Sequence, residues 1–116
     1  MKTAFTIFLL LLLSTVCYAE TIKGIDVERL SLAIYQAEGG LKAKVPFGIL
    51  SVPCSGYADC KAVCERAIRR RLNDWNGEGD FIGFLGKTYA PLNAGNDPKN
   101  LNNNWIHNVS WFYKRG

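Results

Sequence analysis

Metal-ligating side chains are scarce in this sequence. It holds one histidine, His107, and its four cysteines include no Cys-x-x-Cys pair. The ligand spacings of common zinc sites are therefore missing. The sequence also lacks internal repeats, a heptad pattern and a Gly-X-Y period, which excludes solenoids, coiled coils and collagen. We expect a domain with no metal and no other cofactor.

The strict alternation of apolar and polar residues that marks a half-buried strand is also nearly absent. Apolar residues instead recur at helical spacing in four segments, at about residues 26–38, 58–75, 80–91 and from 104 onward. A length of 116 residues suits one domain, and a hydrophobic fraction of 48% is too high for a disordered chain. The pattern predicts an all-α, mainly helical single domain.

Two long loops connect these helices, over residues 41–57 and 91–103. Both are rich in turn-forming residues such as Gly, Pro and Asn. The first loop nevertheless carries several large apolar side chains, which are too apolar for a free surface: Phe47, Ile49, Leu50 and Val52. We expect this loop to pack against the domain or to line a site.

Residues 1–19 have the features of a secretory signal peptide. Lys2 is followed by an apolar block, and Cys17 and Ala19 occupy the −3 and −1 positions of a cut before Glu20. The apolar block is shorter than the ~20 residues that span a bilayer. Lipid anchoring through Cys17 is the minor alternative, because Val16 stands where a lipoprotein site has a small residue.

The expected mature domain therefore covers residues 20–116 and is exported, to the periplasm or the extracellular space. We expect no stable insertion into the membrane once the signal peptide is removed. A formal net charge of only +4 gives little support for nucleic-acid binding by such a chain. We expect it to act as a monomer.

Three cysteines remain after export, so one thiol is left over. Cys60 and Cys64 are four residues apart on an expected helix, a spacing that does not favour a bridge within a continuous helix. Cys54 lies in the preceding loop and can fold back onto the first helical turn. We favour a Cys54–Cys60 disulfide with Cys64 as a buried free thiol, and Cys54–Cys64 is the alternative.

Glu38 has the sequence context of a general acid. It ends the first expected helix, immediately before Gly39 and Gly40. The negative end of the helix dipole disfavours a carboxylate there, and partial burial would act in the same direction. A carboxyl group that keeps its proton near neutral pH is what acid catalysis of glycoside cleavage requires. The alternative is a solvated glutamate that frays the helix end.

Several short runs resemble the lysozyme-like superfamily of small bacterial lytic transglycosylases. They are residues 33–40 (AIYQAEGG), 46–52 (PFGILSV), 80–85 (DFIGFL), 88–91 (TYAP), 103–106 (NNWI) and 108–109 (NV). Together they extend over nearly the whole expected mature domain. The resemblance implies a lysozyme-like fold with long active-site loops and peptidoglycan glycan strands as the partner.

The resemblance also implies roles for individual residues. Glu38 matches the catalytic acid/base, Gly48 and Ser51 match a groove-lining motif, and Tyr89 matches a tyrosine of the active-site region. The family commonly has Gln at the position of Ser51. The amide of Asn104, within an Asn-rich segment, is expected to bind sugar hydroxyl and acetamido groups, with helix capping as the alternative.

A retaining or inverting glycosidase needs a second carboxylate near the first. The candidates are Asp59, Asp74, Asp80 and Asp97, and none stands out, since Asp59 and Asp80 fit helix caps better. In the family that these runs resemble, lytic transglycosylases use a single Glu, so the resemblance implies cleavage of the MurNAc-GlcNAc bond by Glu38 alone. The alternatives are a catalytically weak glycan-binding module of the same fold and a small disulfide-stapled interaction or inhibitor protein.

Overall fold

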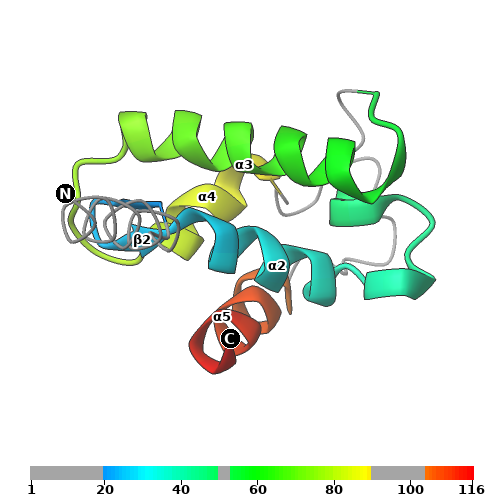
Figure 1. The fold of residues 1–116 in the computed structure, drawn as a ribbon. Coiled ribbons are helices and arrows are strands. Elements are labelled where there is room, and N and C mark those ends of the chain that lie inside the picture. Colours follow the sequence, from blue (N-terminus) through cyan, green and yellow to red (C-terminus); the bar gives the residue numbers. More distant parts are fainter. Residues whose placement is uncertain (1–19, 50–52, 90–103) are drawn as a thin grey trace, which may run out of the picture.

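The computed structural model describes residues 20–49, 53–89 and 104–116. Within these ranges the protein is mostly helical, which confirms the predicted class (Figure 1). The helices are α2 (Val27–Ala37), α3 (Gly56–Asp74), α4 (Phe81–Tyr89) and α5 (Trp105–Arg115), and each lies within about two residues of its predicted segment. Residues 1–19, the expected signal peptide, lie outside the described ranges.

A small hairpin precedes α2 and was not predicted. Its strands β1 (Thr21–Ile22) and β2 (Ile25–Asp26) pair antiparallel, with Thr21 opposite Asp26 and Ile22 opposite Ile25. Strands of two residues are too short to produce a visible alternation in the sequence. The hairpin leads directly into Asp26, whose Oδ1 accepts a 3.0 Å hydrogen bond from the backbone N–H of Arg29 and caps α2.

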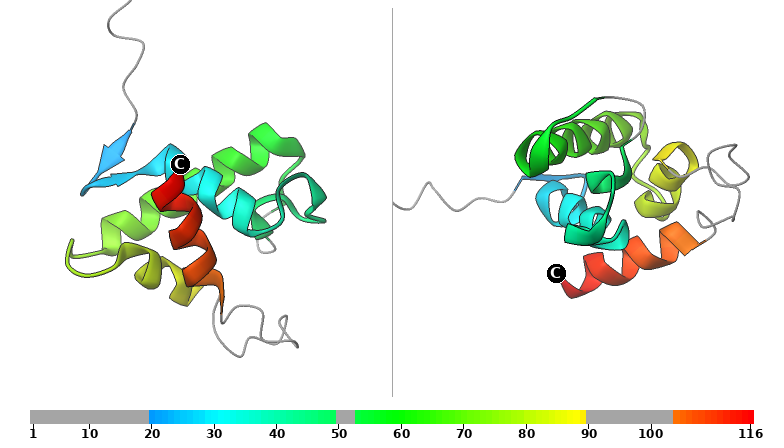
Figure 2. Two further views of the ribbon diagram at one scale, coloured as in Figure 1. Left: turned by 90° about the horizontal axis from the view of Figure 1, so that it is seen from below. Right: turned by 90° about the vertical axis from the view of Figure 1, so that its right-hand side faces the viewer.

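Helix α2 occupies the centre of the fold, between α3 and α5 (Figure 1). A view from the side shows α4 closing the space between α3 and α5 (Figure 2). The apolar face of each helix points toward the other helices, and these faces form one core. The core is formed by Val27, Leu30, Ala33, Ile34, Phe47, Cys60, Cys64, Ile68, Leu72, Trp75, Phe81, Ile82, Leu85, Trp105 and Val109. Trp111 lies off this core and is 44% exposed.

The segment between α2 and α3 packs onto the domain through Phe47, as its apolar content predicts. It contains two short 3-10 turns, η1 (Gly40–Lys42) and η2 (Pro46–Gly48). Phe47 is fully buried, with ring centroids 5.1 Å from Tyr35 and 5.7 Å from Tyr57. Its φ of 62° is rare for a non-glycine residue, so the surrounding contacts must hold this backbone conformation.

A disulfide joins Cys54, which precedes α3, to Cys60 in the first turns of that helix. This is the pairing favoured from the sequence. Cys64 lies one helical turn further, fully buried and with a free thiol. Burial raises the pKa of that thiol to about 12, so it stays protonated and unreactive at neutral pH. A disulfide is typical of oxidising compartments such as the periplasm. None of the described helices combines the length and the apolar character needed to cross a membrane.

Candidate active site

Glu38 forms the C-terminal cap of α2. Its backbone N–H donates to the carbonyl of Ile34 at 2.9 Å, and Gly39 then leaves the helix with a φ of 111°. The side chain is half-buried, and its Oε1 accepts a 2.8 Å hydrogen bond from the indole Nε1–H of Trp105. Burial raises the pKa of the Glu38 carboxyl, and the Trp105 bond opposes this in part. The raised pKa is the direction that a general acid requires.

Gly48 in η2 lies directly against the Glu38 carboxyl group. A Cβ atom added to Gly48 would fall 2.6 Å from Cδ of Glu38 and 2.7 and 2.8 Å from its two oxygens. Gly48 also has a φ of 67°, a conformation that side chains disfavour. Glycine is therefore required at this position both by the backbone and by the close approach of the carboxyl.

Tyr89, the last residue of α4, connects to the same site through η2. Its hydroxyl donates a short hydrogen bond to the carbonyl of Phe47, and the sulfur of Cys64 lies 3.6 Å away. Its ring stacks on Trp105 with centroids 5.2 Å apart. Burial, followed by Cys64 and then Glu38, raises the pKa of this hydroxyl far above its usual value. Tyr89 therefore remains a neutral donor that supports the backbone next to Gly48.

Three of the predicted site residues thus lie together: Glu38, Gly48 and Tyr89. Ser51 falls outside the described residues. Asn104 occupies the N-cap position of α5, directly before Trp105, but its exposed side chain makes no capping hydrogen bond to that helix. The described hydrogen bond to the Glu38 carboxyl comes from Trp105 and not from Asn104.

Trp105 is the site residue that the sequence did not reveal. Its helical spacing predicts a core residue, and it is indeed 6% exposed. Its residue type alone predicts a hydrogen-bond partner, because the N–H of a buried indole needs an acceptor. The acceptor, Glu38, is 67 residues away in the chain, so no local pattern identifies it.

The described aspartates that were candidates for a second carboxylate are engaged elsewhere. Asp80 Oδ1 accepts from the backbone N–H of Ile82 and caps α4. Asp59 Oδ2 accepts from the backbone N–H of Ser55 at the start of α3. Asp74 pairs with Arg71 at 2.8 Å. Asp97 lies outside the described residues. Each of the three described aspartates thus has a partner other than Glu38, and a single catalytic carboxylate stays a prediction.

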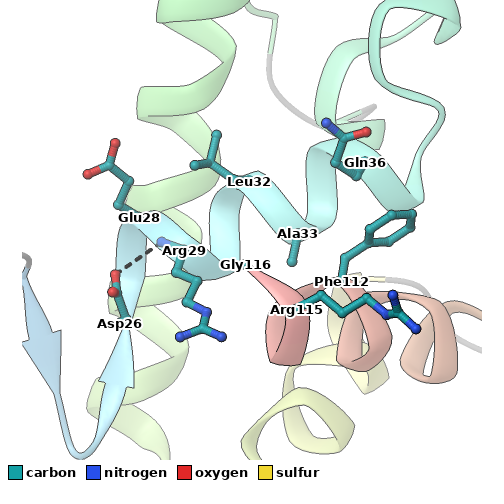
Figure 3. A pocket seen from close by; sticks show the side chains of 9 residues that line it. All are labelled: Asp26, Glu28, Arg29, Leu32, Ala33, Gln36, Phe112, Arg115 and Gly116. Atoms are coloured by element: carbon teal, nitrogen blue, oxygen red, sulfur yellow. Dashed lines mark hydrogen bonds between the residues drawn. The ribbon is translucent and has the colours of Figure 1, made fainter.

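A concave region lies between α2 and the C-terminal part of α5 (Figure 3). Its lining mixes the apolar side chains of Leu32, Ala33 and Phe112 with charged and polar ones, and it includes neither Gly48, Tyr89 nor Trp105. The lining residues are Asp26, Glu28, Arg29, Leu32, Ala33, Gln36, Phe112, Arg115 and Gly116. This groove is thus separate from the acid site.

No family model matches the chain, and comparison with the curated proteins and with the solved structures found no match. Any functional conclusion therefore depends on the residues of this chain and their geometry.

Proposed function

We propose that this protein is an exported lytic transglycosylase that cleaves peptidoglycan, with a lysozyme-like fold and Glu38 as its general acid/base. The observation that carries the proposal is the half-buried Glu38 carboxyl at the end of α2. Burial raises its pKa, and the C-terminal end of the helix dipole disfavours the charged form as well. A raised pKa is the direction that favours a carboxyl group holding a proton and giving it to a leaving oxygen.

The immediate surroundings of Glu38 support this chemistry. Because Gly48 has no side chain, the Glu38 carboxyl lies directly against its backbone, where a Cβ atom would clash. Trp105 holds one carboxyl oxygen in a defined position. Preorganisation of this kind is what positions a catalytic group for reaction. Export is supported by the Cys54–Cys60 disulfide and the signal-like residues 1–19.

The reaction needs one carboxyl group in two successive roles. The protonated Glu38 first gives its proton to the glycosidic oxygen, and the bond between that oxygen and the anomeric carbon of MurNAc breaks. The resulting carboxylate then takes the proton of the MurNAc 6-hydroxyl, whose oxygen bonds to the anomeric carbon. The products are a free GlcNAc hydroxyl and a 1,6-anhydro sugar, and Glu38 ends protonated as it began.

The test compares Glu38→Gln with Glu28→Gln on purified peptidoglycan. Both variants replace a glutamate of the same helix region, but Glu28 is exposed and belongs to the rim of the groove between α2 and α5. We expect Glu38→Gln to lose at least the ~10²–10⁴-fold that acid–base catalysis contributes, and Glu28→Gln to retain wild-type activity. Unchanged cleavage by Glu38→Gln would refute the assignment.

Mass spectrometry of the wild-type products distinguishes the remaining possibilities. A 1,6-anhydro end, lighter than the hydrolysed sugar by one water, supports the transglycosylase. Reducing ends would identify a hydrolase with a second carboxylate still to be found. Glycan binding without cleavage would identify a binding module, and no binding at all would favour an interaction protein.

A further inference from the structure

The hydrogen bond between Trp105 and Glu38 restricts where the acid proton can reside. Indole Nε1–H is a donor and has no acceptor capacity. It donates to Oε1 of Glu38 at 2.8 Å from a side chain that is almost fully buried. In a protonated carboxyl group the carbonyl oxygen is the better acceptor, so Oε1 takes that role. The proton is then carried by Oε2.

The position of Trp105 is itself fixed by neighbouring elements. Its ring stacks on Tyr89, whose hydroxyl is bonded to the carbonyl of Phe47. Helix α4 approaches α5 closely at Gly86, where an added Cβ would lie 2.9 Å from Ile106 and 3.4 Å from the Trp105 ring. The indole therefore has little freedom to turn its N–H away from Glu38.

We propose that Trp105 is a positioning residue that places the acid proton of Glu38 on Oε2, the oxygen that protonates the leaving group. This inference rests on the proposed function for its catalytic consequence. The hydrogen bond itself affects the pKa and the position of the Glu38 carboxyl. These effects do not depend on cleavage and can be measured separately.

Among the described residues that face Glu38, Trp105 is the one whose contact favours the charged carboxylate form. Tyr89 of α4 lies nearby with a raised pKa and is neutral, and so is the thiol of Cys64 on α3. The turn η2 presents Gly48, which carries no side chain. Among the described residues no lysine or arginine forms an ion pair with Glu38. Removing the indole N–H should therefore raise the pKa of Glu38 further.

The experiment compares Trp105→Phe with Trp75→Phe. Both replace a buried indole whose N–H is bonded, but that of Trp75 donates to the carbonyl of Glu78, on another part of the chain. NMR titration of ¹³C-labelled glutamate side chains should show a higher Glu38 pKa in Trp105→Phe and an unchanged one in Trp75→Phe. An unchanged Glu38 pKa in Trp105→Phe would overturn the proposal.

Kinetics supply the catalytic readout. Loss of the acid proton at high pH sets the alkaline limb of kcat/KM, so this limb should move to higher pH in Trp105→Phe. At its optimum kcat should fall by about 10²-fold, the scale of a misplaced catalytic group, with a smaller change in KM. A loss of activity with an unmoved limb would mean a merely structural role. If the wild type cleaves nothing while the NMR pKa still moves, the proposed function fails and the hydrogen bond remains.

A further NMR measurement uses the wild-type protein, so it does not depend on whether the Trp105 variant folds. The indole N–H resonance of Trp105 should shift with pH at the same pKa as the Glu38 carboxyl. In Glu38→Gln it should remain displaced, because the amide oxygen still accepts the bond, but lose this pH dependence. A wild-type indole resonance that does not shift with pH would contradict the hydrogen bond between Trp105 and Glu38.

Discussion

At the scale of a single residue, Glu38 holds its proton more tightly in the folded protein than in the unfolded chain. Burial is the main cause, since it disfavours the charged carboxylate. The folded state therefore gains stability while Glu38 is protonated and loses it as pH rises from the ordinary glutamate range through the raised pKa. A function that needs this proton thus costs some stability at neutral pH.

Glu38→Gln should for this reason stabilise the fold at pH 7. The glutamine carries no charge to desolvate, and its amide oxygen can still accept the N–H of Trp105. The Tm of Glu38→Gln should exceed that of the wild type at pH 7, where each 1 kcal/mol appears as about 4–8 °C in a domain of this size. Below the ordinary glutamate pKa the two Tm values should converge. A variant with a lower Tm at pH 7 would mean that the folded protein stabilises the carboxylate through a contact other than the Trp105 hydrogen bond.

Gly48→Ala tests the close approach of η2 to the carboxyl group, with Gly77→Ala as its control. Both glycines have positive φ, 67° and 85°, so both alanines carry similar backbone strain of about 1–2 kcal/mol. Only at Gly48 would the new Cβ strike Glu38, because nothing lies within 4 Å of a Cβ at Gly77. Both variants should melt at lower temperature, but Gly48→Ala alone should lose about 10²-fold in glycan cleavage. Equal activities would show that Glu38 moves aside without consequence.

At the scale of the elements, the predictable features are those encoded within a few residues. Asp26 before an apolar stripe predicts the start of α2, and Gly39 predicts its end, because capping and positive φ are local requirements. The position of Glu38 at a helix end follows from the same pattern. The positive φ of Phe47 follows from no local rule, since it is maintained by packing and by the hydroxyl of Tyr89.

Tyr89→Phe should weaken the connection between α4 and η2 while keeping the ring stack on Trp105. The Phe47 carbonyl would lose the Tyr89 donor, and an unsatisfied buried acceptor costs about 1–3 kcal/mol. We expect a lower Tm and reduced cleavage, because Gly48 follows Phe47 directly. Tyr57→Phe serves as the control, since Tyr57 also contacts Phe47 but is 46% exposed. A Tm unchanged in Tyr89→Phe would show that η2 is held by the other rings alone.

At the scale of the whole molecule, contacts between distant segments hold the helices in place. Lys23 in the hairpin donates to the carbonyl of Leu72 at 2.7 Å, at the end of α3. Arg29 of α2 donates to the carbonyls of Tyr113 and Lys114 at 2.6 and 3.0 Å, at the end of α5. These contacts join residues 49 to 85 positions apart. Pattern analysis of one sequence predicts the helices but not which of them meet, so Trp105 could be assigned to the core and not to Glu38.

The acid site should therefore exist only when the whole domain is folded. Its described residues come from α2, η2, α4 and α5, and none of these segments contains two of the groups that meet at the carboxyl. In a Trp75→Phe, Trp111→Phe background, Trp105 is the sole tryptophan, and its fluorescence reports on the site. Urea unfolding followed by this fluorescence and by far-UV circular dichroism should give one midpoint, as expected for a two-state domain. If the fluorescence changed at lower urea than the helical signal, α5 would be leaving α2 before the remainder unfolds. The site would then belong to a less stable part of the molecule, and Glu38 would lose its raised pKa before the helices melt.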